Sequence, residues 1–297
     1  MNNFRSDFPA VVLFVILIAF MGSCELINPD ENEPVYMSVD SFAFDVTPTL
    51  PEMGPSTSTK IKDVWVFVDN EIQGIYELPA YFPILNSGSK SVALLPGILL
   101  NGISTTRSPY PFYQPYFDTL EFIPGTEIHV DPTYNYFSSA ICKWCEDFEG
   151  AGFSLTKTNT SDTSMYQTPY MGDNTVFEGV GASVIYLDSN KDFFEIASTT
   201  EYELPKSGNP VYLELDYKID EEMIVGMFVT QPGSVDQFPV ITLNPTTKWN
   251  KIYIELGFII TDYPNASGFK IFFAGFKNPN IAGTASFYID NIKLVHN

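Results

Sequence analysis

Apolar and polar residues alternate over long stretches of the second half of the chain. From Val211 to Ile219 every second side chain is apolar, and the residues between them are Tyr212, Glu214, Asp216 and Lys218. The segment 252–258 repeats this pattern. A period of two directs alternate side chains to opposite faces of a β-strand. The pattern therefore predicts antiparallel sheets with one face in a core and the other face in water.

Shorter apolar runs, separated by turn-forming residues, occupy the first half of the chain. The alternating segment 62–68 is followed by Asp69-Asn70 and then by the run 72–78, which predicts a β-hairpin. Further strands are predicted at 91–95, 119–123 and 126–130, and Pro-Gly pairs follow the first two. Short strands at this spacing are typical of a β-sandwich. We expect an Ig-like sandwich over residues 35–138.

The second half contains enough strand segments for another sandwich. The predicted strands are 184–187, 193–197, 211–219, 223–229, 252–258, 269–273 and 285–295. Turn-forming residues separate them at 206–210 and 264–268. No helix longer than two turns is predicted after residue 24. The expected fold class is therefore all-β, with a C-terminal β-sandwich over residues 142–297.

Three segments of the second half carry a resemblance to known domains. They are Glu146-Asp147-Phe148-Glu149-Gly150, Thr247-Lys248-Trp249-Asn250-Lys251-Ile252-Tyr253-Ile254 and Ser286-Phe287-Tyr288-Ile289-Asp290-Asn291-Ile292-Lys293-Leu294. Together they make residues 145–297 similar to the jelly-roll domains of galactose-binding-like and carbohydrate-binding-module families. The resemblance implies a jelly roll. It also implies a structural Ca²⁺ ion held by Glu149, with Asp147 as the second choice, and by Asp290.

The closing segment changes phase in its middle. Phe287 and Ile289 alternate, but the next apolar residues, Ile292 and Leu294, are one position out of step. Because a shift of one residue reverses the buried face of a strand, we expect a β-bulge at Asp290-Asn291. The alternative to a calcium ligand is that Asp290 accepts hydrogen bonds from backbone N–H groups at this kink.

Residues 1–23 have the pattern of a secretory signal peptide. Arg5 precedes the apolar run 10–21, which is too short to cross a bilayer. The following Met21-Gly22-Ser23-Cys24 resembles the lipobox of bacterial lipoproteins, with Met in place of the usual Leu. The resemblance implies that Cys24 is diacylated and begins the mature chain. The alternative is an ordinary cleaved signal peptide in which Cys24 is incidental.

Residues 24–34 form an acidic segment after the lipobox. They carry four carboxylates, two prolines and no cation, which predicts an extended and solvated tether. Acidic residues at this position resemble the surface-export signals of some Gram-negative lipoproteins. This resemblance implies an outer-membrane protein at the cell surface.

The charge of the chain limits its partners. The formal net charge is -21, with 36 acidic residues against 15 lysines and arginines. Nucleic acid is excluded as a partner, because phosphate backbones are bound by clustered cations. Anionic lipid would also repel the body of the protein, so attachment to a membrane is expected through acyl chains.

Cys142 and Cys145 form a Cys-x-x-Cys pair. If Cys24 is lipidated, these two form an even remainder in an oxidising compartment. A zinc site would need two more ligands, and the chain has only two histidines. A redox motif would open a helix, and no helix is predicted here. We expect a structural disulfide at a turn, or two free thiols.

Four tyrosines are candidates for binding a glycan. Tyr212 and Tyr253 are predicted to face away from the core of their sandwich, and Tyr110 and Tyr113 belong to the segment 108–117, which has five aromatic residues and three prolines. Tyrosine rings can stack on sugar C–H groups while their hydroxyls form hydrogen bonds. The alternative for the segment 108–117 is that it packs against the neighbouring domain or caps its own sandwich.

These features favour a lipid-anchored, non-catalytic envelope protein that binds a glycan or surface polymer. The alternative is an assembly accessory lipoprotein that binds another envelope protein. A glycoside hydrolase or lyase has less support, because it needs two carboxylates at a set distance and, among 36 acidic residues, almost any pair could be nominated. A serine triad lacks its G-x-S-x-G motif, and two histidines leave little for metal or general-base chemistry. Apart from calcium, no cofactor is expected.

The anchor can be tested directly. Cys24→Ser should move the protein from the membrane fraction to the soluble exported fraction, because no other segment is predicted to hold it at a membrane. Fractionation after a high-salt wash, followed by immunoblotting, measures the distribution. A variant that still sediments with membranes would contradict lipidation at Cys24.

Overall fold

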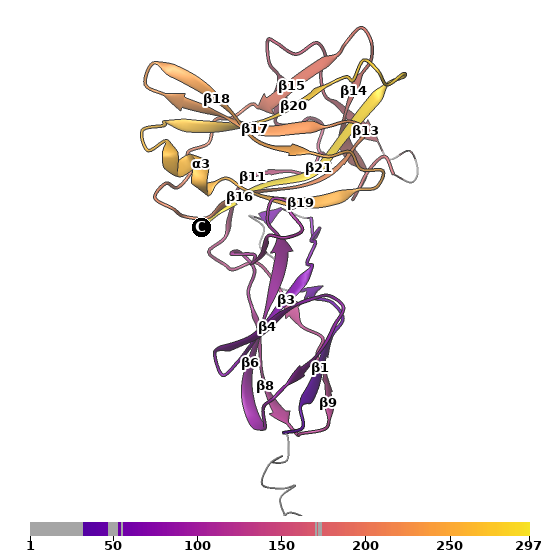
Figure 1. Cartoon of the computed structure of the whole chain (residues 1–297). Helices are drawn as coiled ribbons and strands as arrows, with labels where there is room; N and C mark the ends of the chain where they lie inside the picture. The colour runs from indigo at the N-terminus through magenta and orange to yellow at the C-terminus, as the bar shows by residue number, and fades with distance from the viewer. Residues whose placement is uncertain (1–31, 47–52, 55, 170, 172–173) are drawn as a thin grey trace, which may run out of the picture.

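Two β-sandwiches follow one another along the chain (Figure 1). The computed structural model describes residues 32–46, 53–54, 56–169, 171 and 174–297. The predicted signal peptide, Cys24 and the first part of the tether lie outside the described residues. Within the described part of the chain, no helix is long and apolar enough to cross a membrane. The all-β prediction is confirmed.

The N-terminal sandwich has two sheets around one core. The first sheet contains β5 (Ala80–Ile84), β1 (Val35–Val39) and β9 (Glu127–His129), with β1 antiparallel to β5 and parallel to β9. The second sheet contains β4 (Glu71–Glu77), β3 (Asp63–Val68), β6 (Gly88–Leu99), β7 (Arg107–Pro109) and β8 (Tyr116–Phe122). The short parallel pair β2 (Ala43–Phe44) and β10 (Thr133–Tyr134) accompanies them. Buried valines, mostly from β1, β3 and β6, fill the space between the sheets.

The predicted hairpin is formed by β3 and β4. Asp69 and Asn70 both have positive φ angles, 49° and 67°, as the two central residues of a type I′ turn require. The expected strand end at Pro96-Gly97 is wrong, because β6 continues to Leu99. Pro96 falls in the gap where β8 stops pairing with β6 and β7 starts, so no ladder hydrogen bond needs its missing N–H.

The C-terminal sandwich is a jelly roll of two facing antiparallel sheets. The inner sheet, which faces the N-terminal sandwich, contains β13 (Tyr166–Pro169), β14 (Gly181–Leu187), β21 (Ala285–His296), β16 (Val211–Ile219) and β19 (Asn250–Glu255), with β11 (Ile141–Glu146) on β21. The outer sheet contains β12 (Leu155–Lys157), β15 (Phe193–Ser198), β20 (Gly268–Phe276), β17 (Met223–Gln231) and β18 (Ser234–Leu243). The alternating apolar residues predicted for 211–219 all lie in the shared core.

The predicted kink in the closing strand is confirmed. Phe287, Ile289, Ile292 and Leu294 all reach the core, and the pairing with β16 shifts register between them. Asn291 has a φ of 48°, and β14 and β11 pair with β21 on either side of this residue. The bulge therefore lets one long strand keep a single buried face while it passes from one partner to the next.

The elements of the C-terminal sandwich that were not predicted include the short strands β12 and β13, the strand β18 and the helix α3. β18 is mostly exposed and has no regular alternation, so its sequence carries little strand signal. The helix α3 (Gly257–Asp262) begins within the segment predicted as strand 252–258, where Leu256 still lies in the core and Phe258 is exposed.

β6 runs along the length of the N-terminal sandwich. Gly88, at its start, pairs with Phe122, and Gly125 in the next turn donates its N–H to the carbonyl of Pro34. Just past its other end, Leu100 forms a bridge with Tyr253 of the C-terminal sandwich. A strand of this length spans about 40 Å. The chain therefore enters the N-terminal sandwich at the end remote from the C-terminal one (Figure 1).

The C-terminal sandwich should fold without the N-terminal one. Its core consists only of residues from Trp144 to Leu294, so a fragment of residues 142–297 keeps every core contact. We expect a far-UV circular dichroism spectrum dominated by β structure and a cooperative thermal transition. Recovery of the fragment only as an unfolded or aggregated chain would mean that the two sandwiches cannot be separated.

Candidate functional site

A buried aromatic cluster joins the two sandwiches. From the N-terminal sandwich it contains Tyr110, Phe112, Tyr113, Tyr134 and Tyr136, and from the C-terminal sandwich Tyr212, Tyr253 and Val295. The rings meet mostly edge to face; the centroids of Tyr110 and Tyr212 are 5.2 Å apart at an interplanar angle of 89°. Edge-to-face contacts of this kind are favourable beyond the area that they bury. We call this set the interface cluster.

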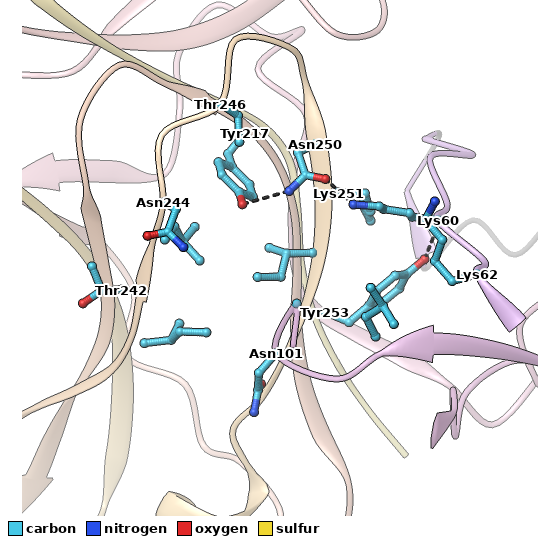
Figure 2. Close-up of a pocket in the computed structure, with 15 residues that line it drawn as sticks. Lys60, Lys62, Asn101, Tyr217, Thr242, Asn244, Thr246, Asn250, Lys251 and Tyr253 are labelled. Carbon is cyan, nitrogen blue, oxygen red and sulfur yellow. Dashed lines mark hydrogen bonds between the residues drawn. The ribbon is translucent and has the colours of Figure 1, made fainter. Parts of the chain in front are cut away.

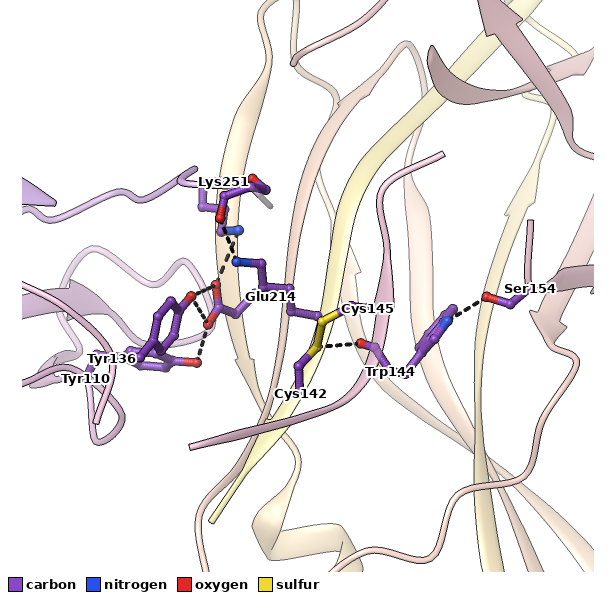
Figure 3. Close-up of a disulfide and its surroundings, with 10 residues drawn as sticks. Tyr110, Tyr136, Cys142, Trp144, Cys145, Ser154, Glu214 and Lys251 are labelled. Carbon is purple, nitrogen blue, oxygen red and sulfur yellow. Dashed lines mark hydrogen bonds and ion pairs between the residues drawn. A yellow bond between two sulfur atoms is a disulfide. The ribbon is translucent and has the colours of Figure 1, made fainter. Parts of the chain in front are cut away.

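The carboxylate of Glu214 lies at the centre of this interface (Figure 3). Its side chain is fully buried, and it accepts hydrogen bonds from the hydroxyls of Tyr110 at 2.6 Å and Tyr136 at 3.0 Å. The ammonium group of Lys251 lies 3.3 Å from the other carboxylate oxygen. Burial raises the pKa of the Tyr110 hydroxyl well above its ordinary value, and Glu214 raises it further. The hydroxyl therefore stays protonated and can donate.

A second carboxylate continues this polar network. Asp216 is also fully buried and accepts a hydrogen bond of 2.8 Å from the hydroxyl of Ser58 in the N-terminal sandwich. Lys293 reaches in the other direction and donates to the carbonyl of Ser56 at 2.8 Å. Glu214 and Asp216, which were predicted on the water-facing side of β16, are therefore buried against the other sandwich.

The four tyrosines proposed as glycan ligands do not form an exposed binding surface. Tyr212 and Tyr253 do point away from the core of their own sandwich, as predicted, but they are only 5% and 2% exposed. Tyr110 and Tyr113 are each 2% exposed and cover them. The prediction of glycan binding by these residues is corrected, because a ligand cannot reach them. The alternative for the segment 108–117, contact with the neighbouring domain, is what the structure has.

Cys142 and Cys145 form a disulfide (Figure 3). Both belong to β11, and the pairing of β11 with β21 shifts register between Cys142 and Trp144. The disulfide therefore fastens a bulge in a strand and not the turn that was expected. It leaves Trp144 directed into the core, where its indole N–H donates to the hydroxyl of Ser154 at 2.7 Å.

The residues proposed for calcium do not fit that ion. Asp290 accepts from the N–H groups of Asn291, Phe177 and Glu178, and Glu149 accepts from the N–H groups of Val180 and Gly181. Hydrogen-bond donors thus surround the oxygens that a cation would need.

Two further observations agree with this arrangement. Burial raises the pKa of Asp290 to about 7, which disfavours its charged form. Asp147 accepts the N–H of Glu149, and the described residues include no group of three metal-binding side chains. The alternative, backbone caps at the kink, matches the geometry.

The outer sheet of the jelly roll has an apolar outer face that the N-terminal sandwich does not cover (Figure 1). It is formed by Phe193, Ala197, Ile224, Phe228, Phe272 and Ala274, together with Phe276 at its end. Phe272, Ala197 and Ala274 are themselves buried, Phe193, Ile224 and Phe228 are half-buried, and Phe276 is exposed. The ring of Phe272 occupies the space above Gly226 that a side chain at 226 would need. The ring centroids of Phe193 and Phe276 are 4.6 Å apart. We call these residues the outer aromatic face.

A cavity of about 570 Å³ opens at one end of the outer aromatic face. Ile224 and Phe276 form its apolar floor, and Phe276 is 61% exposed. The exposed polar residues around it are Asp220, Glu222, Thr242 and Asn278. An apolar floor with a few polar groups at its edge is the usual construction of a small-molecule site, and the volume lies in the usual range. We call this the end cavity.

A buried ion pair fixes one wall of the end cavity. The ammonium group of Lys277 lies 2.7 Å from a carboxylate oxygen of Glu221, and it also donates to the carbonyl of Ile281 at 2.7 Å. Glu221 in turn accepts the N–H of Asn278. The loop 278–281 is therefore attached to the β16–β17 turn, and the cavity is formed before any ligand arrives.

The sequence contained a signal for this face that went unused. In β15, β17 and β20, the residues between the core positions include Phe193, Phe228 and Phe272 beside the polar Glu195, Thr230 and Lys270, whereas a sheet open to water would carry mainly polar side chains there. Apolar residues on both faces of a strand predict that both faces are covered or bind something.

A hydrogen-bonded Ser-His-Asp series occurs on the N-terminal sandwich. The hydroxyl of Ser38 lies 2.9 Å from Nδ1 of His129, and Nε2 of His129 lies 3.1 Å from Asp131. The Asp131 side chain is 86% exposed, and none of these three residues lines the cavities described here. A catalytic triad needs a buried orienting carboxylate and a substrate pocket, so this series carries no catalytic assignment.

The interface hydrogen bond can be tested with a matched pair of variants. Tyr110→Phe should lower the free energy of unfolding by about 1–3 kcal/mol, because it removes a donor from a buried carboxylate. Tyr81→Phe is the control: its hydroxyl also donates to a glutamate at 2.6 Å, but this bond to Glu127 is exposed and should contribute much less. Urea denaturation measures both. Equal effects would contradict the central role of Glu214.

No protein-family model matches the chain, and no curated protein sequence matches it. Solved structures with a similar fold include a xylan-binding CBM22 domain from Paenibacillus barcinonensis Xyn10C, with 14% identity, a TM-score of 0.37, and coverage of 52% of this chain and 99% of that one. A CBM61 structure in complex with β-1,4-galactotriose has 16% identity, a TM-score of 0.35, and coverage of 51% and 95%.

A family 11 module from Clostridium thermocellum, in complex with a β-1,3-1,4-mixed-linked tetrasaccharide, has 14% identity, a TM-score of 0.34, and coverage of 50% and 94%. Identities and scores at this level assign the chain to none of these families. The jelly-roll assignment follows from the strand order and the shared core.

Proposed function

We propose that this protein is a lipid-anchored, non-catalytic envelope protein that binds a neutral glycan at Phe276, the exposed end of the outer aromatic face, and in the end cavity. The observation that carries the proposal is the combination of exposed Phe276 with the polar edge of the end cavity. Apolar rings can cover the C–H face of a sugar. The carboxylates and amides at the edge accept and donate hydrogen bonds to its hydroxyls.

The charge of the cavity edge supports a neutral ligand. Asp220 and Glu222 are exposed there, and the nearby Lys277 is already paired with Glu221. A ligand with carboxylate or sulfate groups would be repelled at this edge. Sugar hydroxyls, in contrast, are good donors to carboxylates.

The placement of the outer aromatic face supports display from a membrane. The chain enters the molecule at the far end of the N-terminal sandwich, and the outer sheet lies on the opposite side of the jelly roll (Figure 1). If Cys24 is lipidated, the tether and the N-terminal sandwich would hold the outer aromatic face away from the membrane. The outer membrane and the cell surface are the proposed location.

The second candidate is an assembly lipoprotein that binds another envelope protein. The exposed apolar residues Phe276 and Ile281, which both line the end cavity, are the observation that favours it. Both candidates use the same surface, so one set of variants serves for both. Loss of a co-purifying envelope protein in Phe276→Ala, with no glycan retained by the wild type, would favour the assembly role.

Phe276→Ala should weaken retention of the Cys24→Ser protein by its polysaccharide about tenfold, which corresponds to about 1.4 kcal/mol. Affinity electrophoresis in gels containing xylan, β-1,4-galactan or β-1,3-1,4-glucan measures retention. Phe117→Ala is the control, because Phe117 is 69% exposed but lies on the N-terminal sandwich. Equal retention of the two variants, or no retention of the wild type by any of the gels, would contradict glycan binding at this face.

A further inference from the structure

A second cavity lies where the two sandwiches meet, beside the edge of β19 (Figure 2). Its volume is about 140 Å³. The N-terminal sandwich contributes Lys60, Lys62 and Asn101, and the C-terminal sandwich contributes Asn244, Thr246 and Asn250. Pockets for drug-sized ligands have volumes of about 300–1,000 Å³. This junction cavity therefore has room for one small group and not for an oligosaccharide.

The junction cavity is basic in an acidic protein. Three lysines line it, and no acidic residue of the described part of the chain does. One of the three, Lys251, is paired with Glu214 in the interface. Lys60 and Lys62 are the two lining lysines outside this ion pair. Their concentration in a chain of net charge -21 favours an anion at this place.

The two remaining lysines repel each other. The pKa of Lys60 is lowered first by burial and then by the charge of Lys62, with Asp216 acting in the opposite direction. The ammonium group of Lys60 donates to the side-chain oxygen of Asn250. The ammonium group of Lys62 forms no hydrogen bond or ion pair with any residue of the described part of the chain. An anion between the two would relieve the repulsion and give Lys62 a partner.

Hydrogen bonds within the C-terminal sandwich and across the junction hold the walls in place. The side-chain amide of Asn250 donates to the hydroxyl of Tyr217 at 2.8 Å, and the backbone N–H of Lys60 donates to the hydroxyl of Tyr253 at 2.9 Å (Figure 2). Asn101 donates its N–H to the carbonyl of Tyr253 at 3.0 Å and accepts the N–H of Glu255 at 2.8 Å. A preorganised site of this kind loses little entropy when a ligand binds.

One polar group of the junction cavity lacks a protein partner. The hydroxyl oxygen of Thr246 is buried and forms no hydrogen bond with any described residue. Buried polar atoms in native proteins are nearly always satisfied, by protein, water or ligand. A polar ligand in the junction cavity could satisfy this hydroxyl while it contacts the lysines.

We propose that the junction cavity binds the acidic group of a charged sugar residue, either a carboxylate or a sulfate ester. A lysine ammonium is a compact point charge and takes both the planar and the tetrahedral oxyanion. The ligand would contact lysines of one sandwich and amides of the other, and it would fasten the two together. This ligand is distinct from the neutral glycan proposed for the end cavity, and its site is separate from the outer aromatic face.

Isothermal titration calorimetry of the Cys24→Ser protein tests this proposal. Galacturonic acid and glucose 6-sulfate are the two probes, galactose is the neutral control, and inorganic phosphate is the free anion. We expect at least one acidic sugar to bind, galactose not to bind, and the affinity to fall as NaCl is added. Binding of galacturonic acid would identify the bound group as a carboxylate, and binding of glucose 6-sulfate would identify it as a sulfate ester. Binding of phosphate as tight as that of the sugar acids, or no binding of either acid, would overturn the proposal.

Lys62→Gln should weaken binding of the acidic sugar about tenfold. This variant should fold, because no described hydrogen bond or ion pair holds the Lys62 ammonium, and an unchanged melting temperature verifies it. Lys157→Gln is the matched control, since Lys157 is exposed on β12 in the outer sheet. Equal affinities of Lys62→Gln and wild type would also overturn the proposal.

Phe276→Ala separates this proposal from the glycan site. It should leave binding of the acidic sugar unchanged, because the junction cavity does not include Phe276. If polysaccharide retention fails in every variant while the acidic sugar still binds, only the outer aromatic face is wrong. If retention depends on Phe276 and no acid binds, only the junction cavity is wrong.

Discussion

The relative position of the two sandwiches depends on the buried carboxylate of Glu214. A charge without water needs hydrogen-bond donors and a counterion, and removal of one partner from such a group is strongly destabilising. Here the donors, Tyr110 and Tyr136, belong to one sandwich, and the counterion, Lys251, belongs to the other. If the sandwiches separated, the tyrosine hydroxyls would lose their acceptor and the interface cluster would face water. The interface therefore acts as a second core, in contrast to the loose contacts that separate most domains.

This interface decides which surfaces of the jelly roll can bind a ligand. The inner sheet has the sandwich core on one side and the interface on the other. Tyr212 and Tyr253 are therefore buried and inaccessible to a ligand. The outer sheet has the core on one side only. Its other side carries Phe193, Phe228 and Phe272, and the end cavity continues it. The proposed glycan site therefore lies at the exposed end of the outer sheet, on the side of the jelly roll that faces away from the N-terminal sandwich.

The two cavities also differ in the charge of the residues that line them. The end cavity has Asp220 and Glu222 at its edge, whereas the junction cavity has only lysines among its charged lining residues. Like charges at such short range disfavour a ligand strongly. The two cavities are therefore suited to different ligands, neutral sugar at one and an oxyanion at the other. A protein with a net charge of -21 uses three of its few cations at the junction.

The sequence by itself determined the elements whose signal is local. Alternation over 211–219 specified β16 and its core face, Asp69-Asn70 specified a two-residue hairpin turn, and the change of phase at Asp290-Asn291 specified a bulge. Each depends on the geometry of one strand or turn, which a few neighbouring residues encode.

Only the tertiary structure decided what covers the strand faces that point away from the sandwich core. Glu214 and Asp216 look like solvent-facing residues in the sequence, yet both are fully buried, because partners more than 70 positions away in the chain cover or bind them. The same holds for Asp290, whose carboxylate is capped by N–H groups of a loop over 100 residues distant. Alternation records only that the two faces of a strand differ. What covers the polar face depends on how whole sheets pack, and no local pattern contains that information.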